Sequence, residues 1–231
     1  MSKKKLVKKS PPKSSQFNAN IQYAAGGVVL LVLVFFAWQY IPWKSSPVSN
    51  SPVCELFADI PAAGQYDSAP SMKVDESKSY FANFEMENGG TFKIELYPDK
   101  APITVNSFVF LACKGFYDGV TFHRVLEGFM AQGGDPTGTG MGGPGYEFVN
   151  ENSDLTFDKE GVVAMANSGP DTNGSQFFIT FAPQPMLDGG YTIFGQVIEG
   201  MDTVNAITRR DPDANPDFDG DAIKTVVISE E

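Results

Sequence analysis

The single histidine limits the chemistry that this chain can perform. His123 is the only histidine among 231 residues, so a Ser-His-Asp or Cys-His mechanism has one possible general base. No GxSxG motif or comparable nucleophile setting accompanies it. We therefore do not expect hydrolase chemistry, and we interpret His123 as a structural residue that hydrogen-bonds to the backbone.

Two further segments have compositions that suggest ligand loops. Residues 133–145, GGDPTGTGMGGPG, lack the Lys-Ser/Thr ending of a phosphate loop and the strand-to-helix setting of a dinucleotide fingerprint. Residues 211–221, DPDANPDFDGD, alternate Asp with Asn as a calcium loop does, but Pro216 holds the position of its glycine and Ala222 that of its glutamate. We interpret the first as an irregular surface loop and the second as a solvated loop before the last strand.

Three longer segments carry a more specific pattern. They are FHRVLEGFMAQGGDPTGTG (122–140), GVVAMANSGPDTNGSQFFITF (161–181) and MLDGGYTIFGQVIEGMDTVNAI (186–207). In sequence, order and spacing they resemble the cyclophilin signature over about residues 80–229, and the MGGPGYEF loop resembles that of the compact prokaryotic type. The resemblance implies a peptidyl-prolyl cis-trans isomerase. Its expected fold is mainly β, a closed eight-stranded antiparallel barrel capped by two α-helices, with the substrate in a groove on the outer face.

Carried over position by position, the resemblance places active-site residues in all three segments. The catalytic positions would be Arg124, Phe129 and Gln132. The substrate-binding positions would be Met130, Ala166, Asn167, Gln176, Phe178, Met186, Leu187 and Tyr191. Two of them depart from the best-known eukaryotic pattern, since Met186 stands where many members have Trp and Tyr191 where many have His. The first predicts weak cyclosporin binding, because that Trp helps to bind the drug, whereas the second occurs in bacterial-type members and need not abolish activity.

The residue types suit the rotation of an X-Pro peptide bond. The planar amide must pass a twisted state over a barrier of ~18–20 kcal/mol, and in that state the prolyl nitrogen regains a lone pair. A guanidinium such as that of Arg124 can donate to this nitrogen and stabilise the twisted state over both planar ones. No acid, base, nucleophile, metal or cofactor is formally required.

The other positions divide into an apolar and a polar set. The apolar set, which would hold the proline ring, is Phe129, Met130, Phe178 and Leu187. Gln132 and the backbone of Asn167 would fix the residues before the proline. Any one of the apolar residues alone would be interpreted as core packing, but their coincidence with an Arg, a Gln and the MAN and GSQFF segments favours a binding site.

The apolar pattern predicts short strands joined by tight turns. YFANFEM (80–86) and TFKIELY (91–97) flank Glu-Asn-Gly-Gly at 87–90, which is a strong hairpin signal. Pro102 and an apolar run closed by Gly115 predict a helix of about three turns. Further strands are expected at 161–165, 176–181, 192–197 and 223–228, and a short helix at 201–207.

The N-terminal part predicts a membrane anchor. Residues 1–20 are a basic tail expected to be disordered, and residues 21–43 are almost wholly apolar, matching the ~20 residues that cross a ~30 Å hydrocarbon layer. A cleaved signal peptide is the alternative, but no small-x-small site follows Phe36, so we favour an uncleaved anchor. Six of the seven lysines in residues 1–44 precede the span, which predicts a cytoplasmic N-terminus. Residues 44–79 are then an extracytoplasmic linker and residues 80–231 the isomerase domain.

The two cysteines leave two interpretations open. Cys54 and Cys113 match no zinc pattern and no CxxC pair. They are either independent thiols, one in the linker and one in the apolar helix, or a single bridge formed in an oxidising compartment.

Charge limits the partners. Residues 45–231 carry ten basic against 28 acidic residues, a net charge of −18, which repels phosphate backbones. We expect no nucleic acid partner, but proline-containing polypeptides and a membrane contact through residues 21–43. The predicted function is to assist the folding of extracytoplasmic proteins. Two alternatives stay open: a non-catalytic proline-peptide-binding or chaperone module, which the retained Arg124 argues against, and an envelope structural protein with incidental activity.

Overall fold

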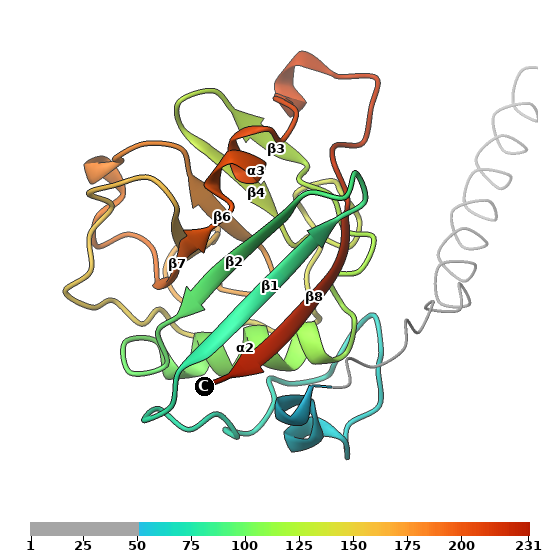
Figure 1. Cartoon of the computed structure of the whole chain (residues 1–231), viewed down its shortest axis with the longest axis vertical. Coiled ribbons are helices and arrows are strands. Elements are labelled where there is room, and N and C mark those ends of the chain that lie inside the picture. Colours follow the sequence, from blue (N-terminus) through green and yellow to red (C-terminus); the bar gives the residue numbers. More distant parts are fainter. Residues whose placement is uncertain (1–50) are drawn as a thin grey trace, which may run out of the picture. The chain divides into compact units, whose positions relative to one another are not determined.

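The strands of this chain form one continuous antiparallel sheet. The computed structural model describes residues 51–231. Within them the strands are β1 (Tyr80–Met86), β2 (Thr91–Leu96), β3 (Arg124–Leu126), β4 (Met130–Gly133), β5 (Val162–Met165), β6 (Phe177–Thr180), β7 (Ile193–Glu199) and β8 (Ile223–Glu230). Their order in the sheet is β3-β4-β6-β5-β7-β2-β1-β8, and β2, β1 and β8 are seen side by side in Figure 1.

The predicted hairpin forms at the predicted place. β1 pairs with β2 so that Phe84 lies opposite Phe92, and their rings stack with centroids 4.5 Å apart. The turn is closed by the Met86 amide, which donates to the Gly90 carbonyl, and Gly89 takes a φ of 86° that side chains disfavour. The tight turn and the cross-strand pair therefore fix one register.

The two predicted helices are present at opposite ends of the sheet. They are α2 (Pro102–Cys113) and α3 (Met201–Asn205), and Figure 1 shows α2 at the lower end and α3 at the upper end. The described residues also contain three short 3-10 helices: η1 (Pro52–Phe57), η2 (Pro185–Leu187) and η3 (Pro212–Ala214). α2 begins at Pro102, and it ends where Gly115 takes a φ of 67° and the Phe116 amide donates to Leu111.

Aromatic rings fill the space between α2 and the sheet. Phe177 of β6 makes edge contacts with Phe108 of α2 and Phe84 of β1, at centroid distances of 5.8 Å each. Phe108 also packs against Phe194 of β7 at 5.2 Å. Every residue of β5 and β6 is buried, because both faces of these strands are covered. Their continuous apolar runs follow from that two-sided burial.

The eight antiparallel strands are confirmed, but their ladder forms a half-barrel and does not close. β3 and β8 are the two edges and do not pair with each other. Connecting segments lie between them instead: Thr121 bridges Ala222, and Val125 exchanges backbone hydrogen bonds with Arg210. The expected closure by strand pairing is absent because these connecting segments occupy the gap between the two edges.

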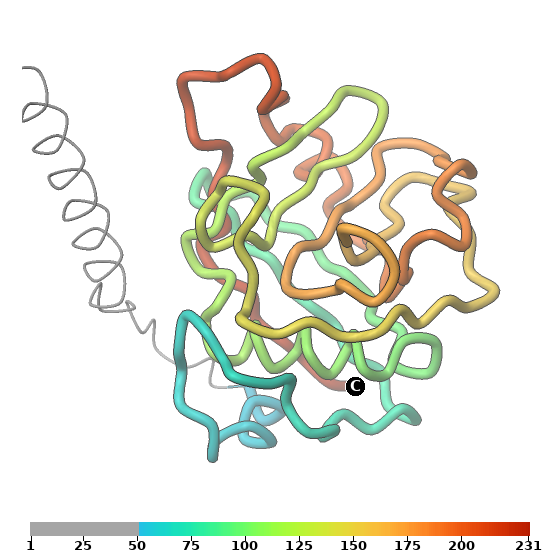
Figure 2. Tube along the Cα trace, turned by 180° about the vertical axis from the view of Figure 1, so that it is seen from behind, coloured from blue at the N-terminus to red at the C-terminus, as the bar shows by residue number. Residues whose placement is uncertain are grey.

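The segment expected to be a linker packs against the domain from Pro52 onward. Val53, Cys54 and Phe57 of η1 are buried, and Cys54 forms a disulfide with Cys113 at the end of α2, with Cα atoms 5.2 Å apart. Of the two interpretations left open, the disulfide bridge is therefore confirmed, and the interpretation as independent thiols is wrong. In Figure 2 this segment, in cyan, runs along the lower side of the domain. Its Tyr66 amide donates to the Pro144 carbonyl at 2.8 Å.

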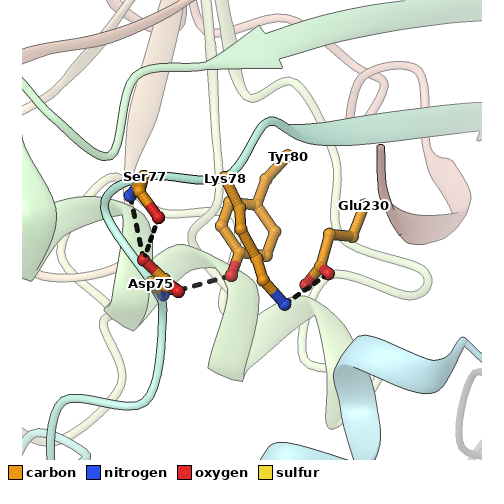
Figure 3. A network of polar contacts seen from close by, with 5 residues as sticks. All are labelled: Asp75, Ser77, Lys78, Tyr80 and Glu230. Atoms are coloured by element: carbon orange, nitrogen blue, oxygen red, sulfur yellow. Dashed lines mark hydrogen bonds and ion pairs between the residues drawn. The ribbon is translucent and has the colours of Figure 1, made fainter.

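A polar network fixes the entry of this segment into β1 (Figure 3). The Ser77 amide and hydroxyl both donate to the Asp75 carboxylate, at 3.0 and 2.7 Å, and the Asp75 amide donates to the Tyr80 hydroxyl. Lys78 forms an ion pair of 2.7 Å with Glu230 at the end of β8. The chain thus reaches the first strand in one defined conformation.

The predicted tail and anchor, residues 1–20 and 21–43, lie outside the described residues. Within residues 51–231 no helix is both long and apolar enough to cross a bilayer.

Candidate active site

Strand register brings the predicted residues into one row. Arg124 of β3 lies directly opposite Gln132 of β4, and Gln132 lies opposite Phe178 of β6. Residues that oppose each other in a ladder point to the same face of the sheet. Arg124, Gln132 and Phe178 therefore share one face, although up to 54 positions separate them in the sequence.

A small cavity of about 180 Å³ opens on this face. It is lined by nine residues, all of them predicted site positions: Arg124, Phe129, Met130, Gln132, Ala166, Asn167, Phe178, Leu187 and Tyr191. Four elements and three connections contribute to it. Folding has thus assembled most of the set that the sequence predicts.

The floor of the cavity is a compact apolar cluster. Met130 and Phe178 are only 2% and 4% exposed, and Phe157 stacks on Phe178 with centroids 5.8 Å apart. Tyr191 meets the Phe178 ring edge-on at 5.3 Å, and Leu187 packs on the same cluster from η2. Rings held from several sides keep their rotamers, so the floor is preformed.

The Arg124 side chain lies on the rim of this cavity. Its guanidinium carbon is 5.8 Å from the centroid of the Phe129 ring, a cation-π distance. Within residues 51–231 the guanidinium has no hydrogen bond or ion pair with an acidic side chain. Its donors are therefore available to a bound molecule.

The polar side of the site is held by amide side chains. The Gln132 Nε2 donates to the Gln176 Oε1 at 3.0 Å, and the Gln176 Nε2 donates to the Gly140 and Gly142 carbonyls at 3.0 and 2.8 Å. Asn167 uses its side chain internally, donating to the Gly190 carbonyl. The Asn167 Oδ1 also accepts from the Gly169 amide at 3.2 Å, so both ends of this side-chain amide are engaged within the protein.

A second cavity of about 670 Å³ adjoins the first. The two share Gln132, Ala166 and Asn167 as lining residues, and Gln176 lines only the second. Gln65, from the segment before the first strand, also lines the second cavity. Sequence reasoning missed Gln65, because nothing in the pattern around it indicates a site.

The glycine-rich loop 133–145 is ordered by one buried carboxylate. Asp135 is 1% exposed and accepts hydrogen bonds from the amides of Thr137, Gly140 and Gly142. Burial opposes ionisation of Asp135, but these hydrogen bonds, led by those from Thr137, bring its pKa below the ordinary value. The loop has no regular secondary structure and lies at the surface, as expected, but these hydrogen bonds give it a defined conformation, and its residues 140–145 line a cavity beside the site. In the sequence, the Asp-Pro-Thr-Gly turn is the signal that could have indicated an ordered loop.

His123 lies behind this loop as a buried structural residue. It is 3% exposed, and its approach to the Thr121 backbone falls short of normal hydrogen-bond geometry, so the expected backbone hydrogen bond is not made. Burial lowers the pKa of His123, and the nearby Asp135 opposes that shift. The imidazole does not line either cavity.

Met186 is the one predicted position that the structure leaves outside both cavities. It lies in η2 beside Leu187, but its side chain is 79% exposed and lines neither space. A side chain that no neighbour holds contributes little to a preformed pocket.

Comparison with known proteins gives a consistent result. A model of the family described as cyclophilin type peptidyl-prolyl cis-trans isomerase matches residues 81–230. Relatives named peptidyl-prolyl cis-trans isomerase-like 1 are 54% identical in Rhizopus delemar, over 54% of this chain and 79% of the relative, and 47% identical in Neurospora crassa, over 62% and 91%. A solved cyclophilin type isomerase of Cryptosporidium parvum, crystallised in the presence of the dipeptide Ala-Pro, superposes with a TM-score of 0.59 at 36% identity. It covers 65% of this chain and 99% of that one.

Proposed function

This chain belongs to the cyclophilin-type peptidyl-prolyl cis-trans isomerase family and is such an isomerase, and we propose that Arg124 is the residue that drives the rotation. The observation that carries this proposal is the unpaired guanidinium at the rim of the apolar cavity. No other Arg or Lys lines that cavity among the described residues.

Apolar and charged groups have different roles in this cavity. A proline ring seated on Met130 and Phe178 would be held while the chain before it turns. In the twisted state the prolyl nitrogen regains its lone pair, and a guanidinium donor at the rim stabilises that state over either planar one. Catalysis here needs no proton transfer, so the enzyme accelerates the rotation by differential binding alone.

The polar wall fixes the residues before the proline. Gln132 is held by Gln176, and Gln176 is held by the glycine-rich loop. An amide side chain fixed in this way can hydrogen-bond an extended peptide backbone without first losing rotamer freedom. This arrangement supports a substrate class of proline-containing polypeptides.

An assay of isomerisation separates this function from the non-catalytic alternative. A binding module would take up an Ala-Pro peptide without changing its cis-trans exchange, whereas an isomerase increases the exchange rate at substoichiometric protein. Exchange spectroscopy by NMR measures both at once. Peptide binding with no increase in exchange would contradict the enzymatic assignment.

We also propose that the domain works outside the cytoplasm on the proteins folding there, held by residues 21–43 as a membrane anchor. The Cys54–Cys113 disulfide supports this location, because such bridges persist in oxidising compartments. The six lysines before the apolar span support a cytoplasmic N-terminus. The compact prokaryotic type likewise remains a proposal, supported by the short MGGPGYEF loop, since the relatives named above are eukaryotic.

Membrane fractionation is expected to retain the full-length protein. An apolar span is held by burial and not by charge, so carbonate or high-salt washing should leave the chain in the membrane pellet. Protease added to the outer side should digest residues 45–231 and spare the lysine tail. Release of the intact chain by carbonate, or protection of the domain from external protease, would overturn the topology.

Cyclosporin is expected to inhibit this enzyme poorly. Met186 is flexible, exposed and without a hydrogen-bond donor, whereas the indole that many members carry there has a rigid face and an N–H. An unpaired acceptor in the drug should cost roughly 1–3 kcal/mol, about ten-fold to more than a hundred-fold in affinity. Met186→Trp should recover that inhibition with little change in peptide turnover.

The control for this prediction is Met72→Trp, which adds an indole at another exposed methionine away from the cavity. Inhibition constants are compared for the wild type and both variants. Nanomolar inhibition of the wild type would show that position 186 does not decide drug binding.

A further inference from the structure

The last strand of the chain leaves one side of its backbone unpaired. Among the described strands, β8 stands at the end of the sheet order and pairs only with β1, beside which Figure 1 shows it. The Glu231 amide donates to the Ser79 carbonyl, and hydrogen-bonded pairs alternate with non-bonded pairs along an antiparallel ladder. By that alternation Val226 and Ile228 direct their N–H and C=O groups away from β1. Beyond Ile223, which bonds to the connection before β3, no described residue pairs with this outer side.

A groove of about 1030 Å³, here called the β8 groove, borders this unpaired side. β8 lines it with residues between 225 and 230, and η1 lines it with Pro52, Val53 and Leu56. Val227 and Leu56 are 40% and 38% exposed, so apolar surface is open to the groove. An added strand needs unpaired backbone groups at a sheet edge and apolar contacts for alternate side chains, and the β8 groove supplies both.

η1 is fixed to the domain before any segment binds. Its Cys54 is joined to Cys113 at the end of α2, and its Phe57 is buried. The Lys114 Nζ, itself buried, donates to the Phe57 carbonyl. This wall of the β8 groove is therefore preformed, and binding does not have to order it first.

The charged side chains of the β8 groove leave one positive charge without a partner. Lys78 and Glu230 neutralise each other in the ion pair of Figure 3. The Asp75 carboxylate accepts hydrogen bonds from the Ser77 amide and hydroxyl. Lys73 also lines the groove and is exposed, and within residues 51–231 it forms no ion pair. An acidic residue on a bound segment is therefore attracted to Lys73.

We propose that the β8 groove binds an extended segment of a client polypeptide, which adds a strand along Val226 and Ile228 and places an acidic residue toward Lys73. Backbone pairing requires no particular sequence, so the ligand class is an unfolded polypeptide. η1 and residues 73–78 also bound the groove, so it fits one strand and not the sheet of a second copy. None of its residues lines either cavity of the isomerase, so this is a second binding site on the domain.

The test uses a probe without proline, acetyl-Thr-Val-Glu-Val-Thr-Val-amide, and full-length protein in detergent. NMR measures the Kd of the probe and the hydrogen exchange of backbone amides. Without the probe, the amides of Val226 and Ile228 should exchange faster than those of Val227 and Ser229, which are bonded to β1. Binding should slow exchange at Val226 and Ile228. Of two probes N-methylated on alternate residues, one should lose binding, because a strand bonds to its neighbour through every second residue.

Charge reversal at Lys73 tests the expected orientation of the segment. Lys73→Glu should raise the Kd of this probe about two- to five-fold, and should lower the Kd of a probe with Lys in place of Glu. Lys159→Glu is the matched control, because Lys159 is exposed and lines none of the three cavities.

The proposal is overturned if the probe does not slow exchange at Val226 and Ile228, or if Lys73→Glu acts no differently from Lys159→Glu. Slow exchange of these two amides in the absence of probe would also overturn it. Protection that rises with protein concentration would then show that a second copy covers the edge, and protection independent of concentration would show that the chain's own residues before 51 do so. Catalysis of exchange in an Ala-Pro peptide bears only on the isomerase function, so the two proposals can fail separately.

Discussion

Arg124→Ala should lower kcat/KM for an Ala-Pro peptide by about 100- to 1000-fold while the protein stays folded. Loss of one preorganised donor to a developing charge or lone pair typically has an effect of this size. The effect should fall mainly on kcat, because the apolar floor made by Met130 and Phe178 still binds the proline ring. Exchange rates at saturating and subsaturating peptide separate the two constants.

Two further variants make this result specific. Arg124→Lys keeps the charge but loses the planar fork of donors, so its rate should fall between those of the wild type and the alanine variant. Arg209→Ala removes an arginine of the surface that pairs with Glu127 and lines neither cavity, so its activity should remain. Circular dichroism confirms that each variant is folded. Equal rates for the wild type and Arg124→Ala would remove this residue from the mechanism.

Removal of the Cys54–Cys113 bridge should lower the free energy of unfolding by about 2–4 kcal/mol. The bridge spans 59 positions, so reduction restores a large conformational freedom to the unfolded chain. For a chain of this size the change corresponds to a fall of roughly 4–16 °C in Tm. Urea unfolding with and without reductant measures this change in the free energy of unfolding. Reduction breaks the bridge but keeps both cysteine side chains, so it leaves no cavity in the packing.

The double variant Cys54→Ala/Cys113→Ala provides the control, because its stability should not respond to reductant at all. η1 should also lose protection from proteolysis on reduction, since Val53 and Phe57 are then held to the domain by packing alone. Quantitative labelling of both cysteines in the unreduced, unfolded protein would show that the bridge does not form.

The sequence predicts the elements whose signals are local. The hairpin at 80–97 forms because an Asn-Gly turn and two alternating strands lie within one short segment, and α2 forms between Pro102 and Gly115 for the same reason. The family was also predicted correctly, and nine of the predicted site positions line the small cavity, while their roles in the reaction stay predictions. Those positions lie in three segments whose order along the chain is itself specific.

Other features depend on contacts between distant segments. β3 and β4 are three and four residues long, too short for a periodic signal, and only their pairing places Arg124 opposite Gln132. The half-barrel stays open between β3 and β8 because connecting segments occupy the gap. Met186 belongs to the predicted set by position, yet the turn of η2 directs it to solvent.

The segment before the first strand shows most clearly the difference between what local sequence predicts and what long-range contacts decide. By itself the sequence determined that residues 44–79 have no periodic apolar face, which is typical of a linker. It could not determine that Cys54 meets Cys113 or that Gln65 reaches Gly143, because each contact joins residues more than 50 positions apart. Local propensity and turn chemistry act between neighbours in the chain, so the sequence of a short segment is enough to predict their effect. Closure of a long loop is decided by the total packing on α2, which only the tertiary structure supplies.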